Sequence, residues 1–469
     1  MTTVRAVRAA LLIDFGSTYT KLRAVDLDRR RILGAGQGPS TVATDVSIGM
    51  QAALDDLGRR LGGLPRFDHR LASSSAAGGL RMVTIGLVRE LTAEAARRAA
   101  LGAGARLVGT FAYRLTRADL ARIDTLRPDI ILLAGGTDGG NADVVLHNAR
   151  VLGAAGIACP LVYAGNRSAA DDAVELLQGR QVIVAGNVMP ELNVLDIEPA
   201  RAAIRQVFID RIVHAKGIDR AQATFDAVLM PTPAAVMEGA RLLADGHGGH
   251  DGIGELVVLD PGGATTDVHS VAAGAPTTPG VIARGLPEPR VKRTVEGDLG
   301  MRHNARAIVE AAGGEALAAA AGLGADAFAA ALDAITADIE RLPGTDAERM
   351  LDRALAQAAL RIAMRRHCGT VETVYTVHGP AVVQEGKDLS GVATVIGTGG
   401  VIAHSPDAAG LIGAALATPD EPASLRPRAP RLLVDRDYLL YACGLLAQVE
   451  PAAALELALN HLQPVEVDA

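Results

Sequence analysis

A short hairpin pattern that occurs twice constrains this chain more than any other feature. An apolar run ends in Asp14, a turn of small residues follows, and an alternating run begins at Lys21. The same order returns where an apolar run ends in Asp260 and an alternating run begins at Asp267. The two aspartates lie 246 residues apart (260 − 14). Two strand-like runs joined by a small polar turn predict a β-hairpin, so we expect two halves that begin alike.

A second pair of motifs follows in the same order. Gly135-Gly136-Thr137 comes after a buried apolar run, and Gly397-Thr398-Gly399-Gly400 comes after another, 262 residues later (397 − 135). Further short apolar runs end in Gly165 and Gly186, with helical patterns between them. Such runs are typical of buried parallel strands, and their alternation with helices predicts an α/β fold. The repeat therefore predicts a duplicated α/β lobe.

Composition shifts along the chain predict where these lobes begin and end. A glycine-rich stretch at 246–252 is the expected boundary. Ala- and Leu-rich stretches at 305–341 and 346–366 predict helices added to the second lobe. We expect three parts: a first lobe over residues 1–245, a second lobe with this helical insertion over 246–430, and C-terminal helices that close back on the lobes over 431–469.

Composition also excludes several classes of protein. A net charge of −7 without a long basic run argues against nucleic-acid binding. The aromatic content of 3%, with no tryptophan, argues against a platform that stacks single-stranded bases. No uncharged apolar span reaches about 20 residues, so we expect no membrane helix. Cys159, Cys368 and Cys443 are isolated and form no CxxC pair, which suits a reducing cytoplasm.

The two hairpin turns have the chemistry of a phosphate site. Turns of small residues expose backbone N–H groups and hydroxyls, which are hydrogen-bond donors to phosphate oxygens. Asp14 and Asp260 would lie below the phosphates, where a hydrated Mg²⁺ is usually held by one or two carboxylates. Lys21 is close enough in sequence to add positive charge. Each turn alone is explained equally well as a tight hairpin, but the pair together with the Gly397 motif favours phosphate binding.

These segments resemble a known superfamily. The Asp14 and Asp260 hairpins are similar to the two phosphate motifs of the actin, Hsp70 and sugar-kinase fold, and Val395–Gly400 is similar to its adenosine motif. Tyr438–Ala447 is similar to its closing inter-lobe helix. The whole chain resembles, more specifically, the accessory (reactivating) protein family of adenosylcobalamin-dependent glutamate mutase, also called methylaspartate mutase. That resemblance rests on three segments: Leu132–Asn141, Asn187–Glu191 and Thr294–Met301.

The resemblance implies an ATP-dependent, chaperone-like factor. Such proteins bind a B12 mutase whose cofactor is lost or damaged and use ATP to open it, so that damaged cobalamin can leave. The implied cofactors are ATP and Mg²⁺, and the implied partner is a mutase of the glutamate mutase type. The implied catalytic and Mg²⁺-binding residues are Asp14 and Asp260. The implied nucleotide contacts are Gly16, Ser17, Thr18, Lys21, Gly262, Gly263, Thr265 and Thr266 for the phosphates, and Gly397, Gly399 and Gly400 for the adenosine.

Several alternatives stay open. A small-molecule kinase of the same fold would need a catalytic aspartate in its substrate cleft, and no segment here resembles the sugar-kinase version. An actin-like filament ATPase is a third class. The missing GxxxxGK[ST] loop disfavours a P-loop ATPase. Asp260 and Asp138 are both candidates for orienting the attacking water, and the oligomeric state is not determined by the sequence.

Overall fold

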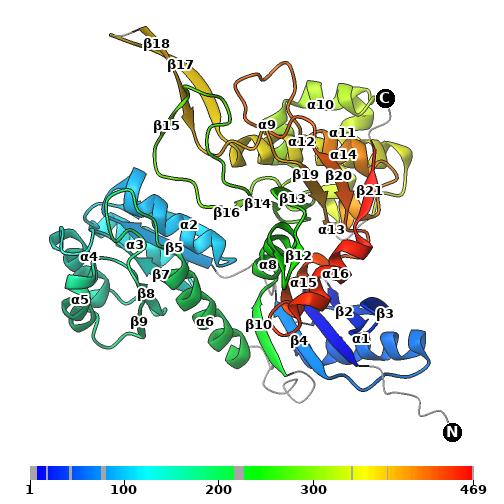
Figure 1. Cartoon of the computed structure of the whole chain (residues 1–469), viewed down its shortest axis with the longest axis horizontal. Helices are drawn as coiled ribbons and strands as arrows, with labels where there is room; N and C mark the ends of the chain where they lie inside the picture. The colour runs from blue at the N-terminus through cyan, green and yellow to red at the C-terminus, as the bar shows by residue number, and fades with distance from the viewer. Residues whose placement is uncertain are drawn as a thin grey trace. The chain divides into compact units, whose positions relative to one another are not determined.

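The structure, a computed structural model, describes residues 8–16, 19–41, 45–74, 81–215, 226–339, 342–377 and 379–466. The chain divides into two compact units, which can be followed by their colours in Figure 1. Unit 1 comprises Met1–Gly239 and Tyr441–Leu457, and unit 2 comprises Ala240–Leu440 and Ala458–Ala469. The segment expected to form C-terminal helices is therefore divided, with Tyr441–Leu457 in unit 1 and the residues on either side of it in unit 2.

The first sheet of unit 1 is built on the first predicted hairpin. Its central strand, β1, is buried at every residue, as a non-alternating apolar run requires. Strands β1, β2 and β3 are consecutive antiparallel neighbours, while β4 and then β10 run parallel to β1 on its other side. The strand order is β10-β4-β1-β2-β3. The strands span Ala9–Phe15 (β1), Tyr19–Asp26 (β2), Arg31–Pro39 (β3), His69–Ser74 (β4) and Ala227–Pro231 (β10), with α1, Val46–Leu61, against β3.

Unit 2 repeats this sheet. Strands β13, β14 and β16 are consecutive antiparallel neighbours, and β19 and then β20 run parallel to β13 on its other side. The order is β16-β14-β13-β19-β20-β21, the last strand being an antiparallel addition. The strands span Leu256–Pro261 (β13), Thr266–Val271 (β14), Val291–Glu296 (β16), Thr394–Gly397 (β19), Arg431–Val434 (β20) and Gln463–Val465 (β21). The predicted fold class, a duplicated actin-like α/β lobe, is confirmed.

A second sheet in unit 1 shows that one part of the predicted repeat, the match between Gly135 and Gly397, is wrong. Strands β5 to β9 form a separate sheet, entirely parallel, in the order β6-β5-β7-β8-β9. Gly135 follows β7 of this sheet, whereas the strand equivalent to β19 is β4. The predicted correspondence between Gly135 and Gly397 is therefore wrong, because a glycine after a buried strand is common to parallel strands in general. The strands span Arg81–Gly86 (β5), Arg106–Ala112 (β6), Ile130–Leu133 (β7), Leu161–Tyr163 (β8) and Val182–Val184 (β9).

This inserted sheet has its own hydrophobic core. Helices α3, α4 and α5 bury Ile123, Val145 and Ala173 against strand residues such as Ile131 and Tyr163. Helices α2 and α6 contact each other and the same sheet. The inserted helices are the π-helix Arg89–Ala93, α2 (Glu94–Gly102), α3 (Arg117–Leu126), α4 (Asp143–Ala154), a 3₁₀ turn at Arg167–Ala169, α5 (Ala170–Leu176) and α6 (Glu198–Ala215). The segment from β5 to α6 is thus an α/β domain inserted between β4 and β10.

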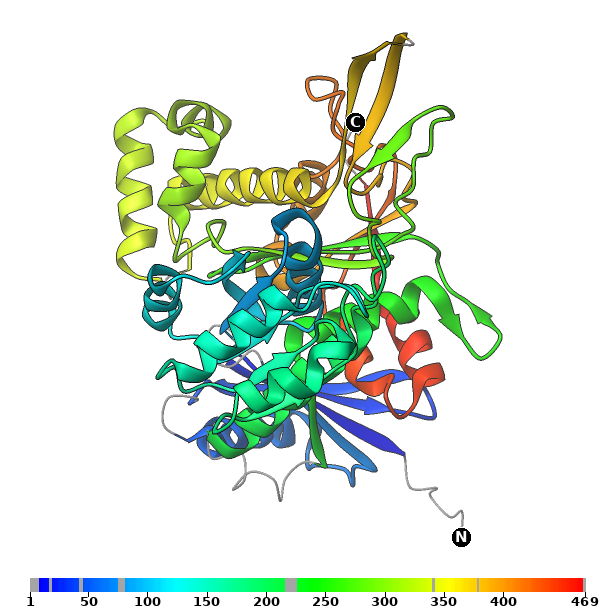
Figure 2. The same cartoon turned by 90° about the vertical axis from the view of Figure 1, so that its left-hand side faces the viewer.

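The helical addition of unit 2 contains more and shorter helices than predicted. Instead of one helix over 305–341, the chain forms α9 (Ala305–Ala312), α10 (Gly314–Ala320) and α11 (Ala325–Ala337), because Gly313 and Gly322 take positive φ and end the turns. The long helix α12, Asp346–His367, begins at a capping box between Thr345 and Glu348. These helices pack around α12 (Figure 2) and share its core.

No single helix among the described residues is long and apolar enough to cross a membrane. The pair α10 and α11 passes that test only together, and it is bent by 96° at its break. The elements not yet named are α8 (Thr232–Asp245), β11 (Gly246–His247), β12 (His250–Asp251), β15 (Ile282–Arg284), β17 (Thr370–Thr376), β18 (Gly379–Glu385), α13 (Gly399–Ala403), α14 (Ala408–Gly413), α15 (Leu440–Leu446) and α16 (Pro451–His461).

Substitution of two glycines in unit 1 by alanine is expected to change the free energy of unfolding in opposite directions. A Cβ on Gly444 of α15 would collide with the carbonyl oxygen of Ala235 in α8, whereas a Cβ on Gly58 of α1 would make ordinary contact with Leu64 at 3.6 Å. We expect Gly444→Ala to lower the free energy of unfolding by about 1–3 kcal/mol through overpacking. Gly58→Ala should raise it by about 0.5–1 kcal/mol, because glycine weakens a helix interior. Urea unfolding followed by far-UV circular dichroism measures both, and equal signs would contradict the packing described.

Candidate functional site

In unit 1, Asp14 lies where the carboxyl ends of three strands meet. It is almost fully buried near the end of β1, directly beside Ser73 of the parallel strand β4. Thr232, which follows β10, donates a hydrogen bond from Oγ1 to Asp14 Oδ1 at 2.6 Å and lies 3.3 Å from Ser73 Oγ. The three side chains therefore form one buried polar cluster. Thr232 was not predicted, since only the register of β10 reveals it.

Burial dominates the electrostatics of this carboxyl group. Loss of water raises the pKa of Asp14 above its usual value, and the charge of Lys21 and the hydroxyl of Thr232 only partly oppose that rise. Lys21 is the cross-strand partner of Asp14 in the β1–β2 hairpin, so the predicted positive charge does lie beside the predicted carboxylate. A divalent cation at this position would favour the charged carboxylate.

The turn after Asp14 is tight enough to require glycine. The N–H of Gly16 donates to the carbonyl oxygen of Tyr19 at 3.0 Å, and a Cβ on Gly16 would lie 2.5 Å from that same oxygen. The carbonyl oxygen of Gly16 accepts from Ser40 Oγ at 2.8 Å. Ser17 and Thr18, the other predicted phosphate contacts of this turn, lie outside the described residues.

In unit 2, the predicted second phosphate motif meets the predicted adenosine motif. A Cβ on Gly399 would collide with Oδ1 of Asp260, and Gly399 has a φ of 79°, so glycine is required on two grounds. Asp260 is half-buried at the end of β13, the position that Asp14 occupies in β1. Gly397 ends β19, and Gly399 and Gly400 begin α13. The structure thus brings together Asp260 and the glycines predicted to approach the adenosine.

In the turn between β13 and β14, several of the predicted phosphate donors already make hydrogen bonds within the protein. The N–H of Gly262 donates to Thr265 at 2.8 Å, while Gly263 is exposed and its carbonyl oxygen accepts from Arg302. Thr265 is half-buried and donates from Oγ1 to Asp267 at 3.1 Å. Thr266 is fully buried, and its hydroxyl donates to the carbonyl oxygen of Leu299 at 2.7 Å.

A buried carboxylate behind the adenosine motif was missed by the sequence analysis. Asp435 follows β20 and accepts from Thr398 Oγ1 at 3.0 Å. It also accepts from the N–H groups of Leu439 and Leu440, at 2.8 and 3.0 Å, at the start of α15. Asp435 therefore fixes the loop between β19 and α13 to the entrance of α15. The only signal in the sequence was an aspartate directly after an apolar run, as at Asp14 and Asp260.

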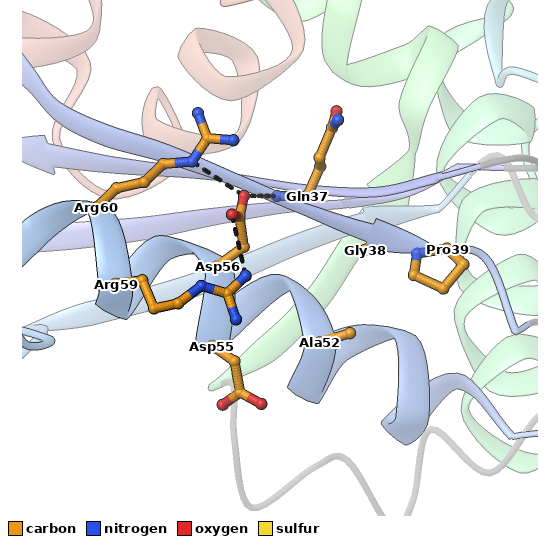
Figure 3. Close-up of a pocket in the computed structure, with 8 residues that line it drawn as sticks. All are labelled: Gln37, Gly38, Pro39, Ala52, Asp55, Asp56, Arg59 and Arg60. Atoms are coloured by element: carbon orange, nitrogen blue, oxygen red, sulfur yellow. Dashed lines mark hydrogen bonds and ion pairs between the residues drawn. The ribbon is translucent and has the colours of Figure 1, made fainter.

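A shallow hollow elsewhere in unit 1 holds none of the predicted site residues (Figure 3). It lies between β3 and α1, where Asp56 accepts from the N–H of Gln37 at 3.1 Å and pairs with Arg59 and Arg60. These contacts, led by the Gln37 hydrogen bond, lower the pKa of Asp56. The charges of the hollow satisfy one another, which is typical of a solvated helix face.

The two predicted carboxylate ligands suit a hydrated magnesium ion better than a metal ion enclosed by several protein side chains. The described part of the chain contains no group of three or more His, Cys, Asp or Glu side chains that could enclose a metal. Asp14 and Asp260 each offer one carboxylate at the end of a central strand. Mg²⁺ keeps several waters and is commonly bound through one or two carboxylates together with substrate phosphates.

The raised pKa of Asp14 predicts a pH-dependent cost in stability. Between its ordinary pKa, 3.8, and the higher folded value, the folded state binds more protons than the unfolded state. Stability contributed by this residue therefore falls as pH rises through that window. Asp14→Asn should gain stability relative to the wild type, by at most about 1.4 kcal/mol per pH unit within the window. Urea unfolding from pH 4 to pH 8 measures the difference, and parallel profiles would contradict it.

Several solved structures resemble the chain at low sequence identity. Among solved structures, nucleotide-free acetone carboxylase aligns over 95% of this chain and 70% of its own, with 16% identity and a TM-score of 0.40. Xylulose kinase from Bifidobacterium adolescentis aligns over 98% and 96%, with 13% identity and a TM-score of 0.35. A glycerol dehydratase reactivase aligns over 94% and 99%, with 11% identity and a TM-score of 0.33.

The sequence comparisons are much stronger. Protein MutL of Clostridium tetanomorphum is 46% identical over 460 residues, which cover 97% of this chain and 100% of that protein. A family model described as MutL protein matches residues 10–462. The chain therefore belongs to the MutL family, the glutamate mutase accessory family that its motifs resemble.

Proposed function

We propose that this protein is an ATP-dependent, chaperone-like reactivating factor for an adenosylcobalamin-dependent mutase of the glutamate mutase type. It binds the inactivated mutase and promotes the release of damaged cobalamin. Membership of the MutL family over nearly the whole chain is the observation that carries this proposal. The repeated sheet supports it, because each copy ends its central strand in a carboxylate beside a glycine turn.

In this proposal ATP and Mg²⁺ bind at the two hairpins. Asp14 and Asp260 hold Mg²⁺ through water, and the turns that follow them contact the phosphates. The phosphate contacts are Gly16, Ser17, Thr18, Lys21, Gly262, Gly263, Thr265 and Thr266. Thr265 is better suited than Thr266 to offer its hydroxyl, because Thr265 is half-buried whereas Thr266 is fully buried. Gly397, Gly399 and Gly400 approach the adenosine, where a Cβ on Gly399 would collide with Asp260.

Hydrolysis at such a site needs positioning and charge stabilisation more than a strong base. The half-buried Asp260 is the better candidate for orienting the attacking water, since Asp138 belongs to the inserted sheet and not to either actin-like sheet. Asp14 contributes a carboxylate whose charged form a bound Mg²⁺ would favour. The three cysteines are buried and form no disulfide among the described residues, which accords with the cytoplasm as the place of action.

Reactivation of a damaged mutase is the decisive test. We expect the purified protein, with ATP and Mg²⁺, to restore activity to a glutamate mutase inactivated with hydroxocobalamin when fresh adenosylcobalamin is supplied. ADP in place of ATP should give no repeated rescue, because the cycle requires hydrolysis. Release of hydroxocobalamin is followed by its visible absorbance after gel filtration. Phosphorylation of a small metabolite without rescue would favour the kinase, and ATP-dependent light scattering without rescue would favour the filament protein.

Two carboxylates are expected to control ATP turnover. Asp14→Ala or Asp260→Ala should reduce the ATPase rate by at least about 100-fold, the scale of losing a main electrostatic contact. Phosphate release measured by a coupled assay gives the rate, and far-UV circular dichroism checks the fold. Asp56→Ala is the matched control, because Asp56 lies in the hollow between β3 and α1, where its charge is paired with Arg59 and Arg60. Retained turnover in a folded Asp14 or Asp260 variant would remove that residue from the site.

A further inference from the structure

The inserted domain has a strand order that creates a ligand site in other proteins. Numbered along the chain from β5 to β9, its five parallel strands lie in the order 2-1-3-4-5. The chain leaves β5 toward one edge of the sheet and leaves β7 toward the other edge. The loops at the carboxyl ends of β5 and β7 therefore separate, and open α/β sheets bind ligands at this switch point. The proposed ATP cycle uses no residue of this domain.

The loop that follows β7 is held in place by buried amides from two neighbouring loops. Asn187, after β9, donates from Nδ2 to the carbonyl oxygen of Gly136 at 3.0 Å and to Asp138 Oδ1 at 2.9 Å. Asn166, after β8, accepts from the N–H of Gly139 and donates to the carbonyl oxygen of Gly140. Two of the three segments by which the sequence resembles its family thus meet at the switch point.

Three consecutive N–H groups of this loop have no acceptor among the residues that the structure describes. The hydrogen bonds of the described residues include none donated by the N–H of Gly135, Gly136 or Thr137. Both glycines are buried, and both have positive φ, at 144° and 74°. A Cβ on Gly136 would collide with the carbonyl oxygen of Asn141. Buried N–H groups are nearly always paired with protein, water or a ligand. We therefore expect a water molecule or a ligand to accept hydrogen bonds from these three groups.

Two residues of opposite charge, Asp138 and Arg167, flank this row of donors. The carboxylate of Asp138 is already engaged, since it accepts from Asn187 and from the N–H of Arg167 at 2.9 Å. Arg167 itself is exposed, and its guanidinium forms no ion pair with any residue in the described ranges. Its backbone is thus fixed beside the loop while its charge stays available.

We propose that the loop from Gly135 to Thr137 binds the phosphoryl group of a phosphate ester. The three N–H groups donate to the phosphoryl oxygens, as consecutive backbone donors do in other phosphate sites, and Arg167 supplies positive charge. The site is separate from the ATP site, because it belongs to the inserted sheet. The inserted domain would then be the part of the chain that recognises a phosphorylated ligand.

Selective isotope labelling of the full-length protein tests this proposal directly. With ¹³C′-glycine and ¹⁵N-threonine, only threonines that follow glycine give signals in a two-dimensional HNCO spectrum. These are Thr110, Thr137, Thr345, Thr370 and Thr398. Thr137→Ser assigns the signal of interest by its loss. Inorganic phosphate is the first probe, followed by AMP as a phosphate ester, with sodium chloride at equal ionic strength and acetate as controls.

We expect phosphate and AMP to shift the Thr137 signal with a saturating curve, while chloride and acetate leave it in place. An unmoved Thr137 signal at millimolar phosphate and AMP would overturn the proposal. An equal shift with acetate would overturn the assignment to phosphate esters. ATP with Mg²⁺ should move Thr398 through the nucleotide site, so a silent Thr398 with a responsive Thr137 would count against the proposed function and leave this site standing.

A charge variant provides the second readout. Arg167→Gln should weaken the phosphate affinity read from Thr137 several-fold, because it removes a charge-assisted contact. Arg150→Gln is the matched control, since Arg150 is exposed near the C-terminal end of α4, and helices return from the carboxyl edge of a parallel sheet. Equal weakening in both variants would show a diffuse charge effect and overturn the role of Arg167.

Discussion

The buried carboxylate of Asp14 is the interaction on which the arrangement of unit 1 depends. An ionisable group at the end of a fully buried strand must be hydrogen-bonded to be tolerated. One hydrogen-bond donor to it, the hydroxyl of Thr232, lies 218 residues later in the chain. The hydrogen bond from Thr232 to Asp14 therefore requires that the chain return to this sheet as β10, beside β4, after the whole inserted domain. This requirement links the site, the sheet and the insertion.

The features that the sequence predicted well are those set by local pattern. Both hairpins form in the expected place, because an apolar run, a small turn and an alternating run are sufficient to specify antiparallel pairing. Three glycine-ended runs became the parallel strands β7, β8 and β9. The predicted neighbours Asp14 and Lys21 are cross-strand partners, since a hairpin fixes its own register.

What the sequence could not supply depends on contacts between distant segments. The equivalence of Gly135 and Gly397 failed because strand order is decided by pairing, and β4 carries no conspicuous motif. Thr232 and Asp435 were missed for the same reason, as each acts on a residue brought close only by sheet formation. The expected long helix at 305–341 broke where glycines adopt positive φ, which an Ala-rich pattern conceals.

The position of the insertion has a consequence for how this family can vary. The inserted domain begins after β4 and ends before β10, and these two strands are adjacent and parallel in the same sheet. Its entry and exit are therefore anchored to neighbouring strands of one rigid layer, and domains with closely spaced ends are the ones that chains accept as insertions. The domain can change in size or specificity during evolution while the register of the sheet beneath it is preserved.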